Sequence, residues 1–195
     1  MKLITLFAFL LSTQVFALNV ATTAPNFKLM GDDSKTHTLK EYAGKIVVLE
    51  WFNEGCPFVK KHYESNNMQK LQENYTKKGI IWLSIISSAK GKQGYRTVAD
   101  VSKIQKKWNI KSSNILFDPE GKVGKLYGAK TTPHMFIVNR EGKIVYQGAI
   151  DSKASTDPAD IPSSTNYVDQ ALKQVMSHQK IKVGRTSPYG CSVKY

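Results

Sequence analysis

The chain has 195 residues, of which 41% are hydrophobic, and this composition suits one domain with an ordinary core and excludes a disordered chain. Its formal net charge of +13 would suit a nucleic-acid partner, but the lysines are spread along the chain and form no short basic block. We therefore expect a basic, solvated surface with affinity for anionic components of the cell envelope, and no nucleic-acid partner.

The N-terminal residues have the pattern of a secretory signal peptide. An apolar run over residues 3–11 follows Lys2, and Val15 and Ala17 stand three and one residues before a plausible cleavage point. This pattern predicts a signal peptide over residues 1–17. The alternative is an uncleaved anchor, for which the apolar run is short.

Export would leave a mature chain with two parts, a domain over residues 18–180 and a C-terminal tail over 181–195. The expected location is periplasmic or secreted, with no transmembrane span in the mature chain. Both cysteines, Cys56 and Cys191, remain after cleavage, and an exported chain can hold a disulfide. Two cysteines without a histidine at ligand spacing do not make a zinc site, so neither a metal nor a cofactor is expected.

The predicted elements alternate between strands and helices. In chain order they are a strand at 24–29, a turn at 31–34, a helical turn at 38–42, a strand at 45–52, a helix at 57–78, a strand at 80–86, a loop at 89–96, a helix at 97–108, a strand at 115–117, a turn at 118–121, a helix at 123–127, a hairpin of 135–138 with 144–147, a loop at 152–165, a helix at 166–179 and an irregular tail at 181–195. Strand–helix–strand units imply parallel pairing and the hairpin adds an antiparallel edge, so we expect an α/β three-layer sandwich with a mixed central sheet.

Cys56 lies at a predicted strand-to-helix junction. Pro57 takes the first helical position, where its missing N–H has no consequence. The free N–H groups and partial positive charge of the helix start would lower the thiol pKa, and Lys60, one turn on, adds a cation. This arrangement suits a redox thiol. The alternative is that Cys56 is only a small buried residue.

Two further features point to chemistry near this junction. Glu50 interrupts an apolar strand, where burial would raise its pKa and make it a candidate proton acceptor. The alternative is a carboxylate that reaches solvent at the strand end. Thr132-Pro133-His134 precedes another apolar strand, and a proline at that place can carry a cis peptide bond in a tight turn.

These segments resemble a known family. Residues 49–59 are similar to the active-site segment of thioredoxins, with Glu50 at the buried acid and Cys56 at the nucleophilic cysteine, and Thr132-Pro133 is similar to their Thr–cis-Pro. The opening at residues 24–45 resembles the peroxiredoxin and alkyl-hydroperoxide-reductase superfamily (AhpC/TSA). Residues 56–63 and the tail at 189–195 resemble the peroxiredoxin-like redoxins. The resemblance implies a thioredoxin-like fold.

The chain departs from both patterns at the reactive segment. Val59 replaces the second cysteine of the thioredoxin Cys-x-x-Cys motif, and Leu49 and Asn53 replace the proline and threonine of the peroxiredoxin motif, although Asn53 can still donate a hydrogen bond. His134 or Lys60 would have to replace the peroxiredoxin arginine. The residues expected to contact substrate are Asn53, Pro57, Lys60, Thr132, Pro133 and His134.

The resulting hypothesis is a thiol-dependent oxidoreductase with antioxidant, peroxidase-like character. Cys56 would attack a peroxide or a protein disulfide, Glu50 would manage protons, Cys191 would resolve the intermediate, and an unidentified thiol would reduce the protein again. Two alternatives stay open: a binding module with a permanent Cys56–Cys191 bond, and a one-cysteine disulfide isomerase helper. In addition, Cys191 could stay free or pair between molecules.

Overall fold

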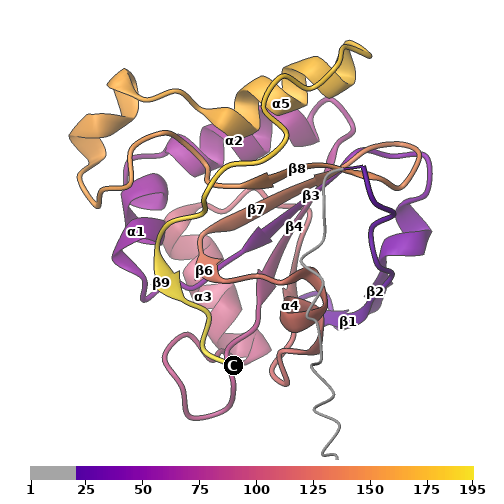
Figure 1. Ribbon diagram of the computed structural model, residues 1–195. Coiled ribbons are helices and arrows are strands. Elements are labelled where there is room, and N and C mark those ends of the chain that lie inside the picture. The colour runs from indigo at the N-terminus through magenta and orange to yellow at the C-terminus, as the bar shows by residue number, and fades with distance from the viewer. Residues whose placement is uncertain (1–20) are drawn as a thin grey trace, which may run out of the picture.

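The computed structural model describes residues 21–195 (Figure 1), so the predicted signal peptide lies outside the described residues. The strands are β1 (Lys28–Gly31), β2 (Thr36–Thr38), β3 (Val47–Trp51), β4 (Ile81–Ile86), β5 (Asn114–Phe117), β6 (Thr131–Thr132), β7 (His134–Val138), β8 (Ile144–Gly148) and β9 (Cys191–Ser192). The helices are α1 (Pro57–Glu64), α2 (Asn67–Thr76), α3 (Val98–Trp108), α4 (Lys122–Tyr127) and α5 (Tyr167–Met176), with 3₁₀ helices η1 (Leu39–Tyr42) and η2 (Pro158–Ser163).

Seven strands form one mixed sheet in the order β2-β1-β5-β4-β3-β7-β8. The central strands β3, β4 and β5 are parallel, whereas β1 pairs antiparallel with β5 and β7 pairs antiparallel with both β3 and β8. The parallel centre follows from the strand–helix–strand units, and the antiparallel edge from the hairpin. The expected α/β sandwich with a mixed sheet is confirmed.

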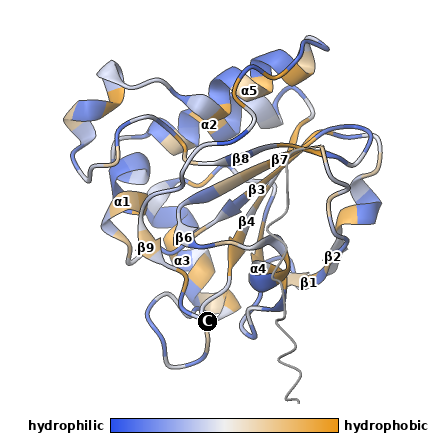
Figure 2. Ribbon diagram, in the orientation of Figure 1, coloured by the Kyte–Doolittle hydropathy of each residue, from blue (hydrophilic) through white to orange (hydrophobic). Residues whose placement is uncertain are grey.

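Each face of the sheet carries its own hydrophobic cluster. Side chains of α1, α2, α3 and α5 pack on one face, while α4, η1 and the segment before β1 cover the other. Figure 1 shows α2 and α5 side by side along the first face, and the hydrophobic colours in Figure 2 concentrate in the central strands. Strands covered on both faces explain the nearly continuous apolar sequence of β3 and β4.

The helix predicted over residues 57–78 is wrong as a single element. It divides into α1 and α2 at Ser65 and Asn66. Asn66 adopts the left-handed conformation, with φ of 59°, and the Ser65 hydroxyl donates to the Lys61 carbonyl at 2.6 Å. Asparagine tolerates that conformation better than most residues, so the helix ends without glycine or proline. As a result α1 has 8 residues and α3, with 11, is longer.

The sequence predicts an irregular tail over residues 181–195, and this prediction is wrong for two residues of the tail. Its residues Cys191 and Ser192 form β9, which pairs antiparallel with Thr132 and Thr131 of β6. In Figure 1 the yellow tail runs from α5 past α1 and lies beside β6. The pairing needs backbone contacts that a turn-rich composition does not reveal. It brings the second cysteine to the first.

Three smaller boundaries also differ from expectation. The first strand occupies Lys28–Gly31 instead of 24–29, and a polar strand, Thr36–Thr38, completes a hairpin with it. The loop over 152–165 contains the 3₁₀ helix Pro158–Ser163, which Asp157 caps. Within residues 21–195, no helix has the length and apolar character needed to cross a membrane.

Candidate active site

Cys56 occupies the N-cap position of α1 and is fully buried. Pro57 follows as the first helical residue, as the sequence predicts. The Cys56 sulfur lies 3.0 Å from the carbonyl oxygen of Thr132 and 2.8 Å from the sulfur of Cys191. The Thr132–Pro133 peptide bond is cis, which also agrees with the sequence. The structure therefore brings together Cys56, the cis-proline turn and the tail cysteine.

The two thiols differ in their acidity. Burial raises the pKa of Cys56, and hydrogen bonds from the side chain and backbone of Cys191 lower it. The Val59 N–H at the helix start and Thr132 lower this pKa further, and the result lies below the ordinary value. Burial and the neighbouring Cys56 raise the pKa of Cys191 to about 11. When the pair loses one proton, Cys56 is therefore the sulfur that carries the negative charge and Cys191 keeps its proton.

Gly190 allows the tail to approach β6 this closely. Its φ is +135°, which L side chains rarely adopt, and a Cβ atom there would collide with the Thr132 carbonyl oxygen. Beyond β9, the Val193 N–H donates to Lys130 O at 3.1 Å and the Tyr195 hydroxyl donates to Ala129 O at 2.7 Å. The tail thus lies along the cis-proline segment over several residues.

Asn53 orders the loops around Cys56 and makes no hydrogen bond to the thiol among the described residues. Its side-chain oxygen accepts the Gly55 N–H at 2.9 Å, and its amide donates to Gln93 O at 3.5 Å. Gly94 is required beside it, because a Cβ atom there would lie 2.5 Å from the Asn53 amide carbon. Asn53 therefore fixes the segment that precedes the nucleophile against the loop at residues 89–96.

Glu50 is fully buried on β3, so the alternative of a solvent-reaching carboxylate is wrong. Its carboxyl oxygens accept hydrogen bonds from four side chains: Tyr63 at 2.7 Å, Trp82 at 2.8 Å, Ser84 at 3.1 Å and Gln72 at 3.2 Å. Burial raises its pKa, and these donors only partly offset the shift. Among the described residues no hydrogen bond joins Glu50 to Cys56, and its part in proton transfer stays a prediction.

Lys60 and His134 lie less favourably for contact with Cys56. Lys60 is exposed on α1. His134 is buried on β7, where its ring contacts Phe136 at 4.6 Å between centroids and its Nδ1 accepts the Lys130 N–H at 3.2 Å. Burial lowers the pKa of His134 to about 3, so it is neutral at pH 7. Because Phe136 packs with the second cluster, His134 faces away from the side of the sheet that carries Cys56.

Sequence reasoning missed a buried polar cluster next to the cysteine pair, which we call the tail-anchor cluster. It consists of Lys61 and His62 on α1, Asp151 after β8, and Tyr189 in the tail. Lys61 Nζ lies 3.6 Å from Asp151 Oδ2, and both side chains are almost fully buried. The Tyr189 hydroxyl donates to Asp151 Oδ1 at 2.5 Å. Tyr189 stands two residues before Cys191.

Two features of the sequence pointed to this cluster. The apolar residues Val59 and Tyr63 mark the buried face of α1. Lys61 and His62 lie between them in the sequence, close to that face. Asp151 directly follows the apolar pair Ala149-Ile150. Neither observation identifies a partner, because Lys61, Asp151 and Tyr189 come from segments that lie far apart in the sequence.

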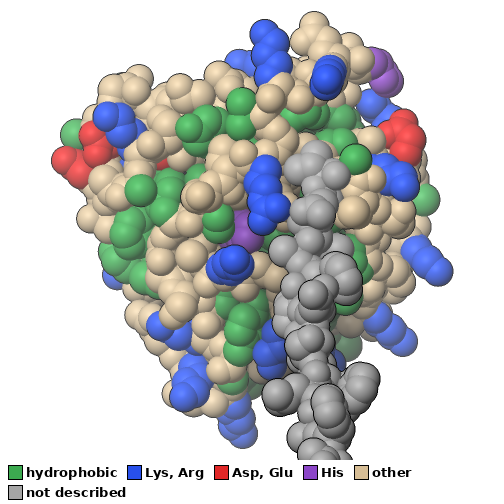
Figure 3. Space-filling model, viewed as in Figure 1, with side chains coloured by type: hydrophobic (Ala, Val, Ile, Leu, Met, Phe, Trp, Pro, Cys, Tyr) green, Lys and Arg blue, Asp and Glu red, His purple; other side chains and the backbone are tan. Residues whose placement is uncertain are grey.

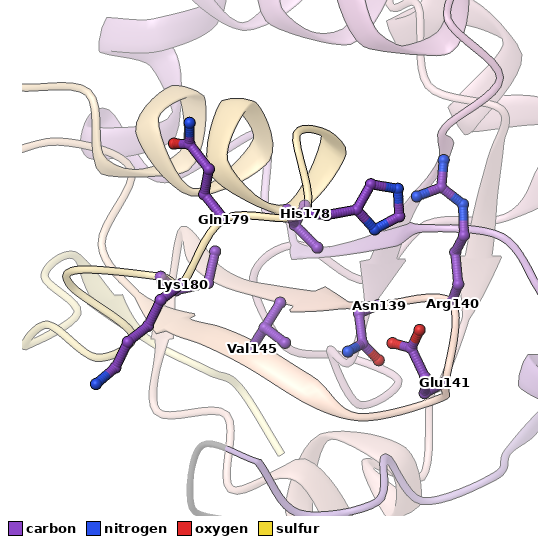
Figure 4. A pocket seen from close by; sticks show the side chains of 9 residues that line it. Asn139, Arg140, Glu141, Val145, His178, Gln179 and Lys180 are labelled. Carbon is purple, nitrogen blue, oxygen red and sulfur yellow. The ribbon is translucent and has the colours of Figure 1, made fainter.

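One surface cavity is formed by residues other than those of the cysteine site. A cavity of about 310 Å³, shown in Figure 4, is lined by residues of the β7–β8 turn and the end of α5, among them Asn139, Arg140 and His178, and no cysteine lines it. On the face shown in Figure 3 the Lys and Arg side chains are scattered and form no single patch. In residues 21–195, no group of three or more His, Cys, Asp or Glu side chains has the arrangement of a metal site.

Cys56 is an acidic thiol at a helix start, and it faces a second thiol beside a cis-proline turn. Together with the mixed sheet, this arrangement defines a thioredoxin-fold thiol protein. More particularly, the chain belongs to the AhpC/TSA family, whose sequence model matches residues 20–147.

Several known proteins resemble the chain in sequence or in fold. Thiol-disulfide oxidoreductase ResA from Bacillus thuringiensis subsp. konkukian is 25% identical over 130 residues, which is 67% of this chain and 69% of that protein. A crystal structure of an uncharacterized conserved protein from Geobacillus kaustophilus has a TM-score of 0.78 at 23% identity and covers 91% of this chain and 92% of that one. A Chlorobium tepidum protein assigned as thiol:disulfide interchange protein DsbE has a TM-score of 0.61 at 23% identity, covering 82% and 99%.

Proposed function

We propose that the protein is an exported thiol–disulfide oxidoreductase in which Cys56 is the nucleophile and Cys191 the resolving cysteine. The observation that carries this proposal is the 2.8 Å separation of the two sulfurs. The lowered pKa of Cys56 and the raised pKa of Cys191 support the division of roles. The name of the ResA relative supports a disulfide as substrate. The N-terminal sequence supports export.

The first half-reaction reduces a substrate disulfide. The Cys56 thiolate attacks one substrate sulfur, a bond to Cys56 forms, the substrate S–S bond breaks, and the departing sulfur takes up a proton. Cys191, after losing its proton, attacks the Cys56 sulfur and releases the second substrate thiol. The substrate gains two electrons and two protons, and the protein is left with a Cys56–Cys191 disulfide.

The second half-reaction restores the dithiol. Cys56 is fully buried whereas Cys191 is partly exposed, so a reductant thiolate reaches the Cys191 sulfur first. Attack there also expels the sulfur with the lower pKa, Cys56, which is the better leaving group. A second reductant thiol then displaces Cys191, and the reductant leaves as a disulfide.

A thiol peroxidase is the second candidate, because the chain belongs to the AhpC/TSA family. Here the Cys56 thiolate would attack a peroxide oxygen, the O–O bond would break, and water or an alcohol would leave. The resulting Cys56 sulfenic acid would condense with the Cys191 thiol to a disulfide and water. The Asn53 amide, at the place of the peroxiredoxin threonine, is turned to Gly55 and Gln93 instead of to the thiol. This orientation favours disulfide exchange.

Stopped flow followed by acid quench and mass analysis tests the proposal. Reduced protein is mixed with a disulfide-bonded peptide in one arm and hydrogen peroxide in the other. We expect the peptide to oxidise the pair at least about tenfold faster than it oxidises free glutathione, because a thiol of low pKa carries more thiolate. Cys56→Ser should abolish the reaction, and Cys191→Ser should stop at a mixed disulfide on Cys56.

Two results would contradict the proposal. A peroxide arm far faster than the peptide arm would make the protein a peroxidase. A Cys56–Cys191 disulfide that resists glutathione buffers, as structural disulfides with potentials below about −300 mV do, would make it a binding module with a permanent bond.

A further inference from the structure

We propose that Tyr189, held by Asp151 and His62, is the positioning residue that places Cys191 on Cys56 for resolution. This inference rests on the proposed roles of the two cysteines. It concerns the tail-anchor cluster, which the redox steps themselves do not use.

The hydrogen bonds of Tyr189 form a directed chain. The Asn67 amide donates to His62 Nδ1 at 2.8 Å, so the neutral ring carries its proton on Nε2. That N–H points to the Tyr189 oxygen at 3.2 Å, and the Tyr189 hydroxyl in turn donates to Asp151 Oδ1 at 2.5 Å. The Tyr189 hydroxyl therefore both accepts and donates a hydrogen bond in the cluster.

The receptor for Tyr189 is built into the domain. Asp151 Oδ1 also accepts the Lys153 N–H at 3.0 Å, while Oδ2 has no hydrogen-bond donor among residues 21–195 and faces the Lys61 ammonium at 3.6 Å. The ammonium is fixed in turn by Lys153 O at 2.9 Å. A buried carboxylate held by a buried cation is a strong acceptor, so its bond to the tyrosine is charge-assisted.

The ring of Tyr189 is held as well as its hydroxyl. It packs on Phe58 with 5.8 Å between centroids, and the Lys61 ammonium lies 5.8 Å from its centroid. The aromatic contact survives loss of the hydroxyl group, so a phenylalanine at this position removes only the polar part of the anchor.

The short distance along the chain connects this anchor to the reactive pair. Only Gly190 separates Tyr189 from Cys191, and Gly190 is fixed against the Thr132 carbonyl. A fixed Tyr189 therefore sets where β9 begins and holds the Cys191 sulfur over the fully buried Cys56. Release of Tyr189 uncovers Cys56 for a substrate disulfide.

Tyr189→Phe tests the proposal, with Tyr195→Phe as the matched control. The control also removes one tail hydroxyl, the one that donates to Ala129 O beyond Cys191. Two quantities are measured: the equilibrium constant of the Cys56–Cys191 disulfide in glutathione buffers, and the rate at which iodoacetamide alkylates Cys56 in the reduced protein.

We expect Tyr189→Phe to lower the equilibrium constant about tenfold and to raise the alkylation rate of Cys56 by a similar factor, as loss of a charge-assisted hydrogen bond implies. Tyr195→Phe should change either quantity less than about twofold. Tyr189→Ala, which also loses the ring contacts, should exceed Tyr189→Phe. Equal effects of the two phenylalanine variants, or no effect of Tyr189→Phe, would overturn the proposal. Both readouts are independent of catalysis, so a protein without oxidoreductase activity leaves this test intact.

Discussion

Two buried carboxylates lie on the Cys56 side of the molecule, and they are satisfied in opposite ways. Glu50 accepts four hydrogen bonds from side chains of α1, α2 and β4, all within the domain. Asp151 has one oxygen bonded to the tail residue Tyr189 and the other facing the charge of Lys61. Glu50 forms its environment together with the core, whereas Asp151 completes its environment only when the tail docks.

This contrast shows how one fold can hold a fixed part and a conditional part near the same thiol. Buried polar groups without partners are costly, so each environment favours the arrangement that completes it. At Glu50 that arrangement is the folded domain itself. At Asp151 it is the docked tail, and with it the approach of Cys191 to Cys56.

The largest expected effect belongs to Lys61. Replacing this buried ammonium by methionine keeps the volume but leaves the Asp151 carboxylate without its cation, which should lower the free energy of unfolding by about 3 kcal/mol. Lys60→Met, on the adjacent exposed lysine, should stay within about 0.5 kcal/mol. Urea denaturation of the reduced proteins measures both.

A second substitution sharpens that result. Adding Asp151→Asn to Lys61→Met removes the uncompensated charge, so the double variant should be less destabilised than the sum of the two single variants. Strict additivity would mean that the two charges do not interact. Equal effects of Lys61→Met and Lys60→Met would contradict the assignment of the tail-anchor cluster.

An intermediate effect is expected from Gly190→Ala, which should prevent the tail from docking and leave the rest of the domain folded. A Cβ atom at this position collides with the Thr132 carbonyl, so β9 can no longer pair with β6 and Cys56 loses its cover. The rate of Cys56 alkylation should rise by at least about tenfold, since exposure governs access to a thiol. Iodoacetamide labelling followed by mass analysis measures this rate.

Gly142→Ala is the control for backbone strain. Gly142 also has a positive φ, of +71°, but an added Cβ atom there meets no other atom within 4 Å. This variant should lose stability and keep the wild-type alkylation rate. If both glycine variants expose Cys56 equally, general destabilisation and not tail docking governs access.

The smallest effect concerns the pH dependence that Glu50 adds. Burial raises its pKa above 4.5, so between that value and the raised one the folded protein holds a proton that the unfolded chain has lost. Stability should therefore fall as pH rises through this window, by up to about 1.4 kcal/mol per pH unit. Glu50→Gln should remove this contribution, and the wild-type minus variant difference in unfolding free energy measures it.

Glu141→Gln, an exposed residue of the β7–β8 turn, is the matched control and should leave the pH dependence unchanged. Burial lowers the pKa of His62 to about 4 and that of His134 to about 3. Both histidines therefore reduce the free energy of unfolding as pH falls below 6.5. Both variants keep these histidines, so the difference curve isolates Glu50. A difference that is flat with pH would show that Glu50 is ionised in the folded protein.

The sequence predicts those features that local chemistry determines. Pro57 after Cys56 marks a helix start, and the apolar runs of β3 and β4 mark buried strands. Two cysteines in a chain expected to be exported suggest the pairing of the tail cysteine with Cys56 but leave open a free or intermolecular Cys191, and the structure brings the two sulfurs together. Their covalent bond stays a prediction.

Other features depend on contacts between distant segments, and the sequence does not reveal them. Lys60 and Lys61 are the same residue type, yet one is exposed and the other buried, because only Lys61 points to Asp151 and the tail. The break at Asn66 has no glycine or proline to announce it. The polar strand at Thr36–Thr38 likewise depends on its partner β1 for its conformation.

Thr186 gives the tail a second attachment, which determines how far the resolving thiol can travel. Its hydroxyl accepts the Ala149 N–H at 2.9 Å and bonds to the Tyr146 hydroxyl at 2.7 Å. If the hydrogen bonds of Tyr189 break while those of Thr186 remain, five peptide units still connect Cys191 to Thr186. Cys191 can then move by roughly 17 Å, at about 3.5 Å per residue. Such a short flexible linker keeps the effective concentration of the Cys191 thiol near Cys56 in the millimolar range, on the order of 1 mM or more. Cys56 can therefore open to a large substrate while its partner remains close enough to return before a competing thiol arrives.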